Sequence, residues 1–362
     1  MINIFQELVP HYRLNFFEGL SKKFNLSLFT LNNLNIDNLN VLQSFPTKKV
    51  KSFRFFKFLW INPYRLLVGR PRILVLMLHP GHLFTWVLLL TKRFHKTKIV
   101  LWGHGISVNN YLREEKNYSK IRLLMINLSD YIWLYTEREE LLLSSLDVHT
   151  PLVALGNTIS DVDLILNDAT KFDINRIKSK YNINQPFIFI FCARFNILER
   201  RIDLLLQIIQ NLDSDKFGFI IIGDGTFKPD FSIFPNVYDF GSLYDNIIKN
   251  DLFRISNAYL QPGWLGLSVV EAMSYGLAPC TFKRSNDVKQ CVEYGYLDNG
   301  VNSKIFDDLK SFIEYFTSNN LFELNYLGDN ARNYIRQNLR MENMICNASS
   351  SINYLSSNTL NL

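Results

Sequence analysis

The chain has 362 residues, of which 48% are hydrophobic and 20% charged. At roughly 100–200 residues per domain, this length predicts about two domains. The composition excludes an intrinsically disordered, collagen-like or low-complexity protein. The four cysteines are widely spaced and form no CxxC pair, so neither a disulfide framework nor a zinc knuckle is indicated.

The net charge of +6 is divided unevenly along the chain. Residues 1–160 contain 20 Lys and Arg against 10 Asp and Glu, whereas residues 161–362 contain 19 against 23. This asymmetry predicts that the amino-terminal half meets an anionic partner, which could be nucleic acid, phospholipid headgroups or a phosphorylated acceptor.

Two features bear on localisation. The first residues, MINIFQELVPHYRL, lack the basic and continuously apolar regions of a signal peptide, which predicts a cytoplasmic protein. The apolar stretch 73–90 is nearly long enough to span a bilayer, at about 20 residues. His79-Pro80-Gly81-His82 interrupts it with turn residues, so a strand, a tight loop and a helix are expected there instead.

Strand-like and helix-like segments alternate along the whole chain. In the first half, apolar runs at 25–30, 73–78, 98–102, 131–135 and 152–155 are separated by helical segments such as 83–94 and 137–145. The second half repeats the scheme with strand ends in PFIFIFCARF, FGFIIIGDG, VYDFG, AYLQPG and LAPCTF.

This alternation predicts an α/β protein with two doubly wound, Rossmann-like domains facing across a cleft that holds the substrates. We place the amino-terminal domain at 1–160 and the carboxy-terminal domain at 161–340, with a polar junction over 156–185. Residues 341–362 are expected to form a helical tail that could pack back on the amino-terminal domain.

The segment 261–276 carries the clearest chemical signal. A strand enters a glycine-containing loop, and a helix is expected to begin near Leu267, with Glu271 on its second turn. Backbone N–H groups of Gly266, Leu267 and Ser268 could hold a pyrophosphate, and Glu271 could accept hydrogen bonds from ribose hydroxyls. The alternative is an ordinary strand-loop-helix connection whose glutamate has no functional role.

Four collinear blocks resemble one enzyme family. GLSVVEAMSYGLAP at 266–279 is similar to the carboxy-terminal signature of retaining glycosyltransferases of family 4, which have the GT-B fold. CARF at 192–195 with ERRID at 199–203 resembles the family's G-R-L…E-K-G-x-D, GDG at 223–225 its G-D-G turn, and VYDFG at 237–241 the strand that follows. VPHYRLNFFEGL at 9–20 resembles the opening of members that act on bacterial surface glycans.

The resemblance implies roles for individual residues. Arg194 and Arg200 would neutralise the departing diphosphate, so that neither a metal nor another cofactor is needed. Gly223 and Gly225 would belong to the donor site with the residues around Glu271. The alternative for the two arginines is a surface position at the start of an amphipathic helix.

The chain departs from the family at one acidic position. The residue eight before Glu271 is Gly263, where the family has a glutamate that contacts the donor sugar. Related forms with P-G-x-x-G-L-S exist, so we interpret Gly263 as a change in donor contacts. An inactive, scaffolding homologue is the alternative.

Several histidines of the amino-terminal half follow predicted strands. His104, between two glycines, is placed where the family has a histidine and could contact the donor sugar, although a structural role is equally open. His11, Tyr12 and Arg13 are expected to contact the acceptor, with a simple turn as the alternative. His79 and His82 have a metal-like spacing, but with no carboxylate or cysteine nearby in the sequence they favour loop structure.

Two further motifs lie outside these blocks. Asp161-Val162-Asp163 matches the D-x-D of another glycosyltransferase fold, but it lies in the predicted junction, so no metal site is predicted. Residues 48–60 contain five basic and five aromatic residues. No RNA-binding motif accompanies them, so we expect contact with an anionic membrane surface and no nucleic acid. The alternative is a solvated basic face with its aromatic residues in the core.

The sequence therefore predicts a metal-independent, retaining hexosyl- or other glycosyltransferase without a cofactor. It would transfer a sugar from a nucleotide-diphosphate donor to a growing, polyprenyl-linked bacterial surface glycan, such as O-antigen or capsule, at the inner face of the plasma membrane. The alternatives are a non-catalytic scaffold of a glycan assembly complex and a nucleotide-sugar epimerase.

Overall fold

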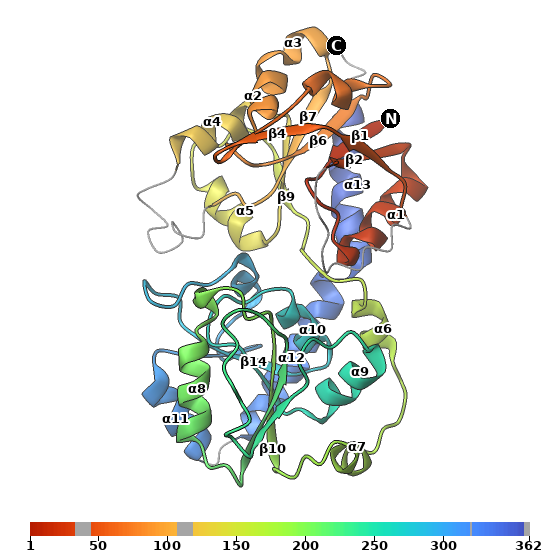
Figure 1. The fold of residues 1–362 in the computed structure, drawn as a ribbon. Helices are drawn as coiled ribbons and strands as arrows, with labels where there is room; N and C mark the ends of the chain where they lie inside the picture. The colour runs from red at the N-terminus through yellow and green to blue at the C-terminus, as the bar shows by residue number, and fades with distance from the viewer. Residues whose placement is uncertain (33–44, 107–118, 319–320, 358–362) are drawn as a thin grey trace. The chain divides into compact units, whose positions relative to one another are not determined.

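The computed structural model describes residues 1–32, 45–106, 119–318 and 321–357. The chain divides into two compact units. Unit 1 consists of Met1–Ser160 together with Met341–Leu362, and unit 2 of Asp161–Arg340. Each unit has its own parallel sheet with helices on both faces (Figure 1).

The sheet of unit 1 has seven parallel strands in the order β3-β2-β1-β6-β7-β8-β9. Its central strands are almost entirely apolar, as expected for a sheet that is covered on both faces. A separate antiparallel hairpin, β4–β5, follows β3. The strands are β1 Ile2–Phe5, β2 Leu26–Leu31, β3 Thr47–Val50, β4 Ser52–Phe55, β5 Phe58–Ile61, β6 Ile73–Met77, β7 Lys98–Trp102, β8 Tyr131–Leu134 and β9 Leu152–Ala154.

Helices cover both faces of this sheet. α1 packs against the carboxy-terminal helix α13 on one face, and α2 packs against α4 in the layer opposite (Figure 1). The tail of the chain is thus part of unit 1. The helices are η1 His11–Arg13, α1 Leu14–Lys23, η2 Pro63–Leu67, α2 Leu83–Leu90, α3 Lys92–His95, α4 Lys120–Leu128, α5 Glu137–Ser144 and α13 Met341–Ser357.

The sheet of unit 2 has six parallel strands in the order β12-β11-β10-β13-β14-β15. Its core is rich in phenylalanine, and the rings of Phe189, Phe312 and Phe316 lie within 4.7–6.0 Å of one another. These aromatic residues bury a large apolar area between the sheet and the helices. The strands are β10 Phe187–Cys192, β11 Phe217–Ile222, β12 Val237–Asp239, β13 Ala258–Leu260, β14 Ala278–Phe282 and β15 Lys304–Phe306.

Helices flank this second sheet on both faces as well. α8 packs against α11 on one side, and α7 packs against α9 on the other (Figure 1). The helices are α6 Val162–Asn167, α7 Ile174–Lys180, η4 Leu198–Arg200, α8 Ile202–Asn211, α9 Asn246–Ile255, α10 Ser268–Ser274, η5 Val292–Tyr296, α11 Leu309–Thr317 and α12 Phe322–Asn338.

The doubly wound α/β architecture predicted from the sequence is confirmed, with local differences. The polar stretch 156–185 is not a linker throughout, because α6 and α7 lie within it and belong to unit 2. The expected helix over 83–94 is divided at Thr91 into α2 and α3. Within the described residues, no helix is long and apolar enough to cross a bilayer.

Each sheet has one place where the chain order reverses direction. In unit 1 this switch point lies between β1 and β6, and in unit 2 between β10 and β13. Ligands of open parallel sheets bind beyond the carboxyl ends of the strands at such a point. The loops that follow these four strands are therefore the candidate ligand-binding loops of the two units.

Candidate functional site

In unit 2, the segment that contains Arg194 and the segment 261–276 both begin at the switch point. β10 ends at Cys192 and is followed by the loop with Arg194, while β13 ends at Leu260 and is followed by the loop 261–267. β10 and β13 pair in register, so both loops begin side by side at the same edge of the sheet. Residues some 70 positions apart in the sequence thus share one site.

Two arginines lie at this edge. Arg194 is exposed in the loop after β10, and Arg200 ends the short helix η4, where its Nε is buried and has no hydrogen-bond partner among the described residues. Burial lowers the pKa of Arg200, and the positive charge of Arg194 acts in the same direction. A guanidinium that is desolvated and close to a second cation favours binding of an anion.

The next arginine has a different role. Arg201 takes the left-handed backbone conformation, with φ of 55°, and its guanidinium forms a double hydrogen bond with Asp203 at 2.6 and 2.8 Å. It also donates to the carbonyl of Asp287. Arg201 therefore fixes the start of α8, whereas Nε of Arg200 has no such partner among the described residues.

A buried polar network, absent from the sequence predictions, holds the loop 261–267. Gln261 is fully buried and donates to the carbonyls of Gly263 and Trp264 at 3.1 and 2.9 Å. Gln290 is also fully buried and accepts from the N–H of Leu265 at 3.0 Å, while it donates to the hydroxyl of Thr281. Such satisfied networks make a loop rigid.

Gly263 has no room for a side chain. A Cβ built at this position would lie 2.4 Å from the carbonyl oxygen of Glu199 and 2.9 Å from Cγ of Arg201. The η4 turn therefore occupies the space into which a glutamate at 263 would project. The missing family glutamate is consistent with this close packing of the two loops.

Glu271 lies on the first turn of α10, one turn earlier than the sequence analysis expected, because the helix begins at Ser268. Its carboxylate is nearly buried and forms an ion pair of 2.7 Å with Lys249 of α9. Burial is the largest single effect and would lower the pKa of Lys249, but the Glu271 carboxylate, together with Cys192 and Asp161, raises it overall. Lys249 was not predicted from the sequence, because its partner lies 22 residues away on another helix.

The donor residues proposed beside Glu271 lie at the start of this helix. Leu267 caps α10 and Ser268 is its first residue, with Gly266 immediately before them. The hydroxyl of Ser268 is hydrogen-bonded to that of Tyr259 at 2.8 Å, and Tyr259 donates to Gln261 at 2.5 Å. The start of α10 is thus tied to the same network that holds the loop.

Gly223 and Gly225 form the turn after β11. Their φ angles are 138° and 151°, and a Cβ on either would lie within 2.2 Å of the backbone of Ala193 or the side chain of Asn196. Only glycine permits this close approach. The turn therefore supports the loop that carries Arg194.

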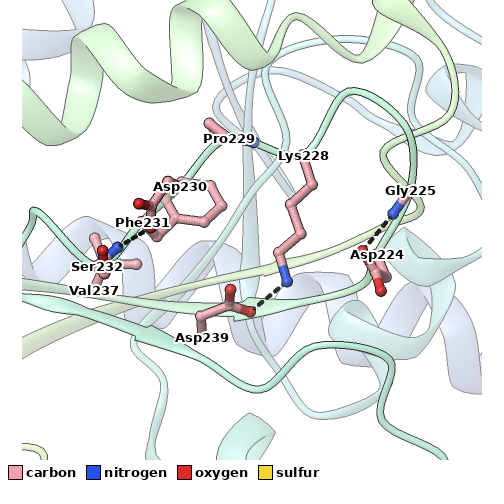
Figure 2. Close-up of a pocket in the computed structure, with 9 residues that line it drawn as sticks. All are labelled: Asp224, Gly225, Lys228, Pro229, Asp230, Phe231, Ser232, Val237 and Asp239. Carbon is pink, nitrogen blue, oxygen red and sulfur yellow. Dashed lines mark hydrogen bonds and ion pairs between the residues drawn. The ribbon is translucent and has the colours of Figure 1, made fainter.

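A pocket of about 530 Å³ opens beside this turn (Figure 2). Lys228 crosses it and forms an ion pair of 2.7 Å with Asp239 at the end of β12. Figure 2 also shows Asp224 accepting a hydrogen bond from the N–H of Gly225. The lining residues are Asp224, Gly225, Lys228, Pro229, Asp230, Phe231, Ser232, Val237 and Asp239.

In unit 1, residues 11–13 form the short helix η1 beyond β1. His11 is exposed, whereas Arg13 is 8% exposed and packs with its guanidinium 4.5 Å from the ring centre of Trp102. Arg13 also donates to Gln6 at 3.1 Å and to the hydroxyl of Tyr135 at 3.0 Å. Of the three, Arg13 is thus built into the unit, and His11 and Tyr12 lie nearer the surface.

His104 lies in the glycine loop after β7, and its ring is 4.7 Å from that of Tyr135. The surroundings lower its pKa to about 4, first by desolvation and then by the positive charges of Arg122 and Arg13. The imidazole is therefore neutral at pH 7. A neutral imidazole can donate one hydrogen bond and accept another, which suits contacts to hydroxyl groups.

Glu139 holds this loop by hydrogen bonds to its backbone. This role was not predicted from the sequence. Its buried carboxylate accepts hydrogen bonds from the N–H of Gly105 at 3.0 Å and of Tyr135 at 3.2 Å. Together with Thr136 it forms a capping box at the start of α5. The sequence signal was the T-x-x-E pattern at 136–139, just before a helix.

The structure places a carboxylate beside the histidines after β6. The sequence offered none, but Glu7, which follows β1, accepts a hydrogen bond from Nε2 of His82 at 2.8 Å and one from Arg54 at 2.5 Å. The His82 bond is the largest of the effects that lower the pKa of Glu7. His79 stacks on His82, with ring centres 4.7 Å apart. This cluster occupies the switch point of unit 1.

The D-x-D sequence lies at the start of α6. Asp161 precedes the helix, and Asp163 accepts a hydrogen bond of 2.6 Å from Arg340. Asp163 thus ties the connection between α12 and α13 to α6. Across the described parts of the chain, no group of three or more His, Cys, Asp and Glu side chains is arranged to hold a metal ion.

The fold has counterparts among solved structures. No family model and no curated protein matches the chain. Anabaena HepE, solved in complex with UDP, superposes with a TM-score of 0.69 at 11% identity, covering 98% of this chain and 99% of its own. The lipopolysaccharide outer core galactosyltransferase WaaB superposes with a TM-score of 0.66 at 14% identity, covering 97% and 98%.

A third structure agrees with these two. A trehalose-6-phosphate protein from E. coli, bound with UDP-2-fluoro glucose, superposes with a TM-score of 0.63 at 11% identity over 98% of each chain. The predicted GT-B fold, with two Rossmann-like domains, is thereby confirmed.

Proposed function

We propose that this protein is a retaining glycosyltransferase that uses a nucleotide-diphosphate sugar. The observation that carries the proposal is the pair Arg194 and Arg200 at the switch point of unit 2, with the buried Nε of Arg200 unpartnered among the described residues. The solved structures of the same fold that bind UDP or UDP-glucose support this choice of donor class.

In the proposed reaction, one bond breaks and one forms at the anomeric carbon. The bond between the anomeric carbon of the sugar and the diphosphate oxygen breaks, and the acceptor hydroxyl oxygen forms a new bond to the same carbon on the same face. The hydroxyl proton passes to the departing diphosphate. Negative charge grows on the diphosphate as it leaves, so two fixed guanidinium groups stabilise the transition state more than the bound donor.

The remaining proposed donor contacts come from unit 2. Backbone N–H groups of Gly266, Leu267 and Ser268 would bind phosphate oxygens, and the Glu271 carboxylate would accept hydrogen bonds from the ribose. The turn at Gly223 and Gly225 lies at the same edge of the sheet. Because the charge on the diphosphate would be met by side chains, we propose a reaction that requires neither metal nor cofactor.

Unit 1 supplies the proposed acceptor side. His11, Tyr12 and Arg13, the proposed acceptor contacts, follow β1, and His104, the proposed contact to the donor sugar, follows β7, all at the carboxyl edge of the sheet. The excess of basic residues in 1–160 favours an acceptor at an anionic surface. We therefore propose a polyprenyl-linked glycan at the inner face of the plasma membrane, as in the synthesis of O-antigen or capsule.

A non-catalytic scaffold is the second candidate, and Gly263 is the observation that favours it. The loop is closed against Glu199, so no side chain at 263 could contact a donor sugar. A scaffold would bind the nucleotide without turning over the sugar.

The test combines binding and turnover. A thermal-shift screen with UDP, GDP and their sugars should show that one nucleotide series raises the melting temperature, because a ligand that binds only the folded state stabilises it. The matching donor should then be hydrolysed slowly, and transferred when membrane extracts are added. Stabilisation without hydrolysis or transfer would favour the scaffold, and no stabilisation by any nucleotide would contradict both candidates.

Treatment with EDTA distinguishes stabilisation of the diphosphate by arginine side chains from stabilisation by a metal ion. Turnover should be unchanged when the purified protein is treated with EDTA, since the proposed cations are arginine side chains. Loss of turnover, restored by added Mg²⁺ or Mn²⁺, would contradict the metal-free reaction.

A further inference from the structure

The hairpin β4–β5 presents an aromatic outer face. Phe53 pairs with Trp60 and Phe55 pairs with Phe58 across the two strands, so their side chains share one face. Phe56 follows at the turn with a left-handed φ of 50°. Phe53, Phe55 and Phe56 are 66%, 59% and 84% exposed, so the outer face is not covered by the rest of the unit.

The inner face of the hairpin is packed in the ordinary way. Leu59 and Ile61 are each 1% exposed, and they alternate with the exposed Phe58 and Trp60 along β5. The inner face of the hairpin therefore supplies its apolar contacts with the core of unit 1. This excludes the alternative in which the aromatic residues of 48–60 lie in the core.

Elements beside the hairpin also expose apolar side chains. α2 packs against β5 and η2, and α3 follows α2 directly (Figure 1). These elements expose Leu90 and Phe94, which are 69% and 85% accessible, and η2 exposes Tyr64. Large exposed apolar surfaces are uncommon in soluble proteins unless they bind something.

The sequence of this region carries charge of one sign, and three of its cations, Arg54, Lys92 and Lys98, pair with acidic residues elsewhere in the unit. Residues 48–98 contain twelve lysines and arginines and no aspartate or glutamate. Lys51 and Lys57, which border the hairpin strands, are exposed. A protein core or an apolar protein partner would not select so many cations, whereas an anionic bilayer attracts cations and accepts aromatic rings at its headgroup level.

The hairpin is fixed to the edge of the sheet where the acceptor is proposed to bind. Arg54 of β4 forms an ion pair with Glu7 in the loop after β1. The N–H of Leu59 donates to the carbonyl of Gly81 in the loop after β6. Both loops border the switch point of unit 1, so whatever the hairpin binds lies close to that edge.

We infer that the β4–β5 hairpin, with α2 and α3 beside it, docks unit 1 on an anionic lipid bilayer, with the aromatic residues inserted among the headgroups and the lysines paired with lipid phosphates. This inference deepens the proposed function, since it names the surface that meets the membrane. Its closest test does not depend on any transferase activity.

The main experiment is sedimentation of the full-length protein with vesicles. We expect binding to vesicles of phosphatidylcholine mixed with phosphatidylglycerol, and weaker binding to phosphatidylcholine alone or in high salt. The variant Phe53→Ser/Phe55→Ser/Phe56→Ser should reduce partitioning to the mixed vesicles by about tenfold or more. These side chains are exposed, so the variant should fold.

A matched variant controls for the loss of exposed aromatic residues in general. Tyr244, Phe322 and Tyr326 of unit 2 are 76%, 83% and 64% exposed. The variant Tyr244→Ser/Phe322→Ser/Tyr326→Ser should partition like the native chain. For charge, Lys49→Gln/Lys51→Gln/Lys57→Gln should weaken binding, whereas Lys216→Gln/Lys283→Gln/Lys310→Gln, with the same change in net charge, should not.

Fluorescence locates the contact. Trp60 is partly exposed, and insertion should shift its emission to the blue and expose it to quenching by brominated lipids. Trp86 lies on α2, which the inference also places at the bilayer, and it is half-buried. The variant Trp60→Phe should therefore reduce the vesicle-dependent change, and Trp60→Phe/Trp86→Phe should remove it. A blue shift that persists in the double variant would place the contact elsewhere and overturn the assignment.

The outcomes separate the docking surface from the proposed function. Vesicle binding that depends on the hairpin supports the inference even where UDP and GDP fail to raise the melting temperature, a result that contradicts only the proposed function. Equal sedimentation of the native chain and both hairpin variants, or no binding to mixed vesicles at low salt, overturns the inference. A concentration-dependent dimer that the triple serine variant abolishes also overturns it, since a second copy would then cover the face.

Discussion

The two switch points share a topology and differ in chemistry. In unit 2, β10 leads into the segment with Arg194 and Arg200, and β13 leads into the loop 261–267, which the buried side chains Gln261 and Gln290 hold. In unit 1, β1 and β6 lead into loops with a carboxylate and two stacked histidines, Glu7, His79 and His82. The two units thus carry different side chains at the same topological position, arginines in unit 2 and a carboxylate with two histidines in unit 1.

The comparison also shows that net charge and local charge are separate properties. Residues 161–362 have more acidic than basic residues, yet the cations proposed to bind the diphosphate lie there. The strongly basic half of the chain instead exposes its charge around the β4–β5 hairpin. Long-range attraction to a surface depends on the sum of the charges, whereas binding of one phosphate group depends on a few that are fixed in place.

The largest effect is expected on turnover, when Arg194 or Arg200 of unit 2 is replaced. Arg200→Met should lower kcat by about 10²–10³-fold, with a smaller change in KM, because the charge that Arg200 stabilises develops in the transition state. Arg194→Met should act in the same direction. Steady-state kinetics with the donor found in the thermal-shift screen measure both constants.

The control for this prediction is Arg200→Lys, which keeps the positive charge and should retain more activity than the methionine variant. A change confined to KM in Arg200→Met would contradict a role in the transition state. It would leave Arg200 as a residue that binds the donor in the ground state.

A smaller effect, on nucleotide affinity, is expected when the ion pair of Glu271 with Lys249 is broken. Glu271→Ala should weaken UDP or GDP binding by about 1–3 kcal/mol if its carboxylate accepts hydrogen bonds from the ribose. Calorimetric titration with the nucleotide measures this affinity. Part of any loss could come from Lys249 alone, since the substitution leaves a buried cation without its partner.

A double-mutant cycle separates the two contributions. If Glu271 contacts the ribose, Glu271→Gln should weaken nucleotide binding also in a Lys249→Met background. Equal affinity of Lys249→Met and Lys249→Met/Glu271→Gln would remove Glu271 from the donor site.

Breaking the buried network that holds the loop 261–267 should lower the stability of the protein. Gln290→Leu leaves the N–H of Leu265 without its acceptor, so the free energy of unfolding should fall by about 1–3 kcal/mol. Urea denaturation measures the change. Gln210→Leu, on an exposed face of α8, serves as the control and should lie within about 0.5 kcal/mol of the native protein. Equal stability of the two variants would argue against a rigid loop.

The smallest effect concerns unit 1 and its dependence on pH, because the side chain of His104 is 45% exposed and solvent screens much of the effect of its lowered pKa on stability. The folded protein holds the pKa of His104 near 4, against 6.5 for an unperturbed imidazole, so protonation favours the unfolded chain. The contribution of His104 to stability is complete above pH 6.5 and is lost as the pH falls through 4. His104→Asn should therefore lose less stability than the native chain between pH 6.5 and 4. Identical pH profiles would contradict the desolvated histidine.

Much of the fold could be predicted because it depends on local patterns. The strand 98–102 is observed with the same bounds, and the helix predicted near Leu267 begins at Ser268. Apolar runs of strand length, separated by helical periods, are sufficient to indicate a parallel sheet. The segments around Arg194 and Glu271 could be singled out because they follow strand ends, where ligands of such sheets bind.

The sequence by itself determined the parallel α/β architecture, the order of the strand and helix segments and the uneven charge, since these depend on residue type and spacing. Only the tertiary structure decided which distant residues meet. Glu7 reaches His82 across 75 positions, and Lys249 reaches Glu271 from another helix. It also decided that the inner face of β5 fills the core, which leaves Phe53, Phe55 and Phe56 exposed. Pairing and burial depend on how elements pack, and a pattern within one segment does not specify its neighbours.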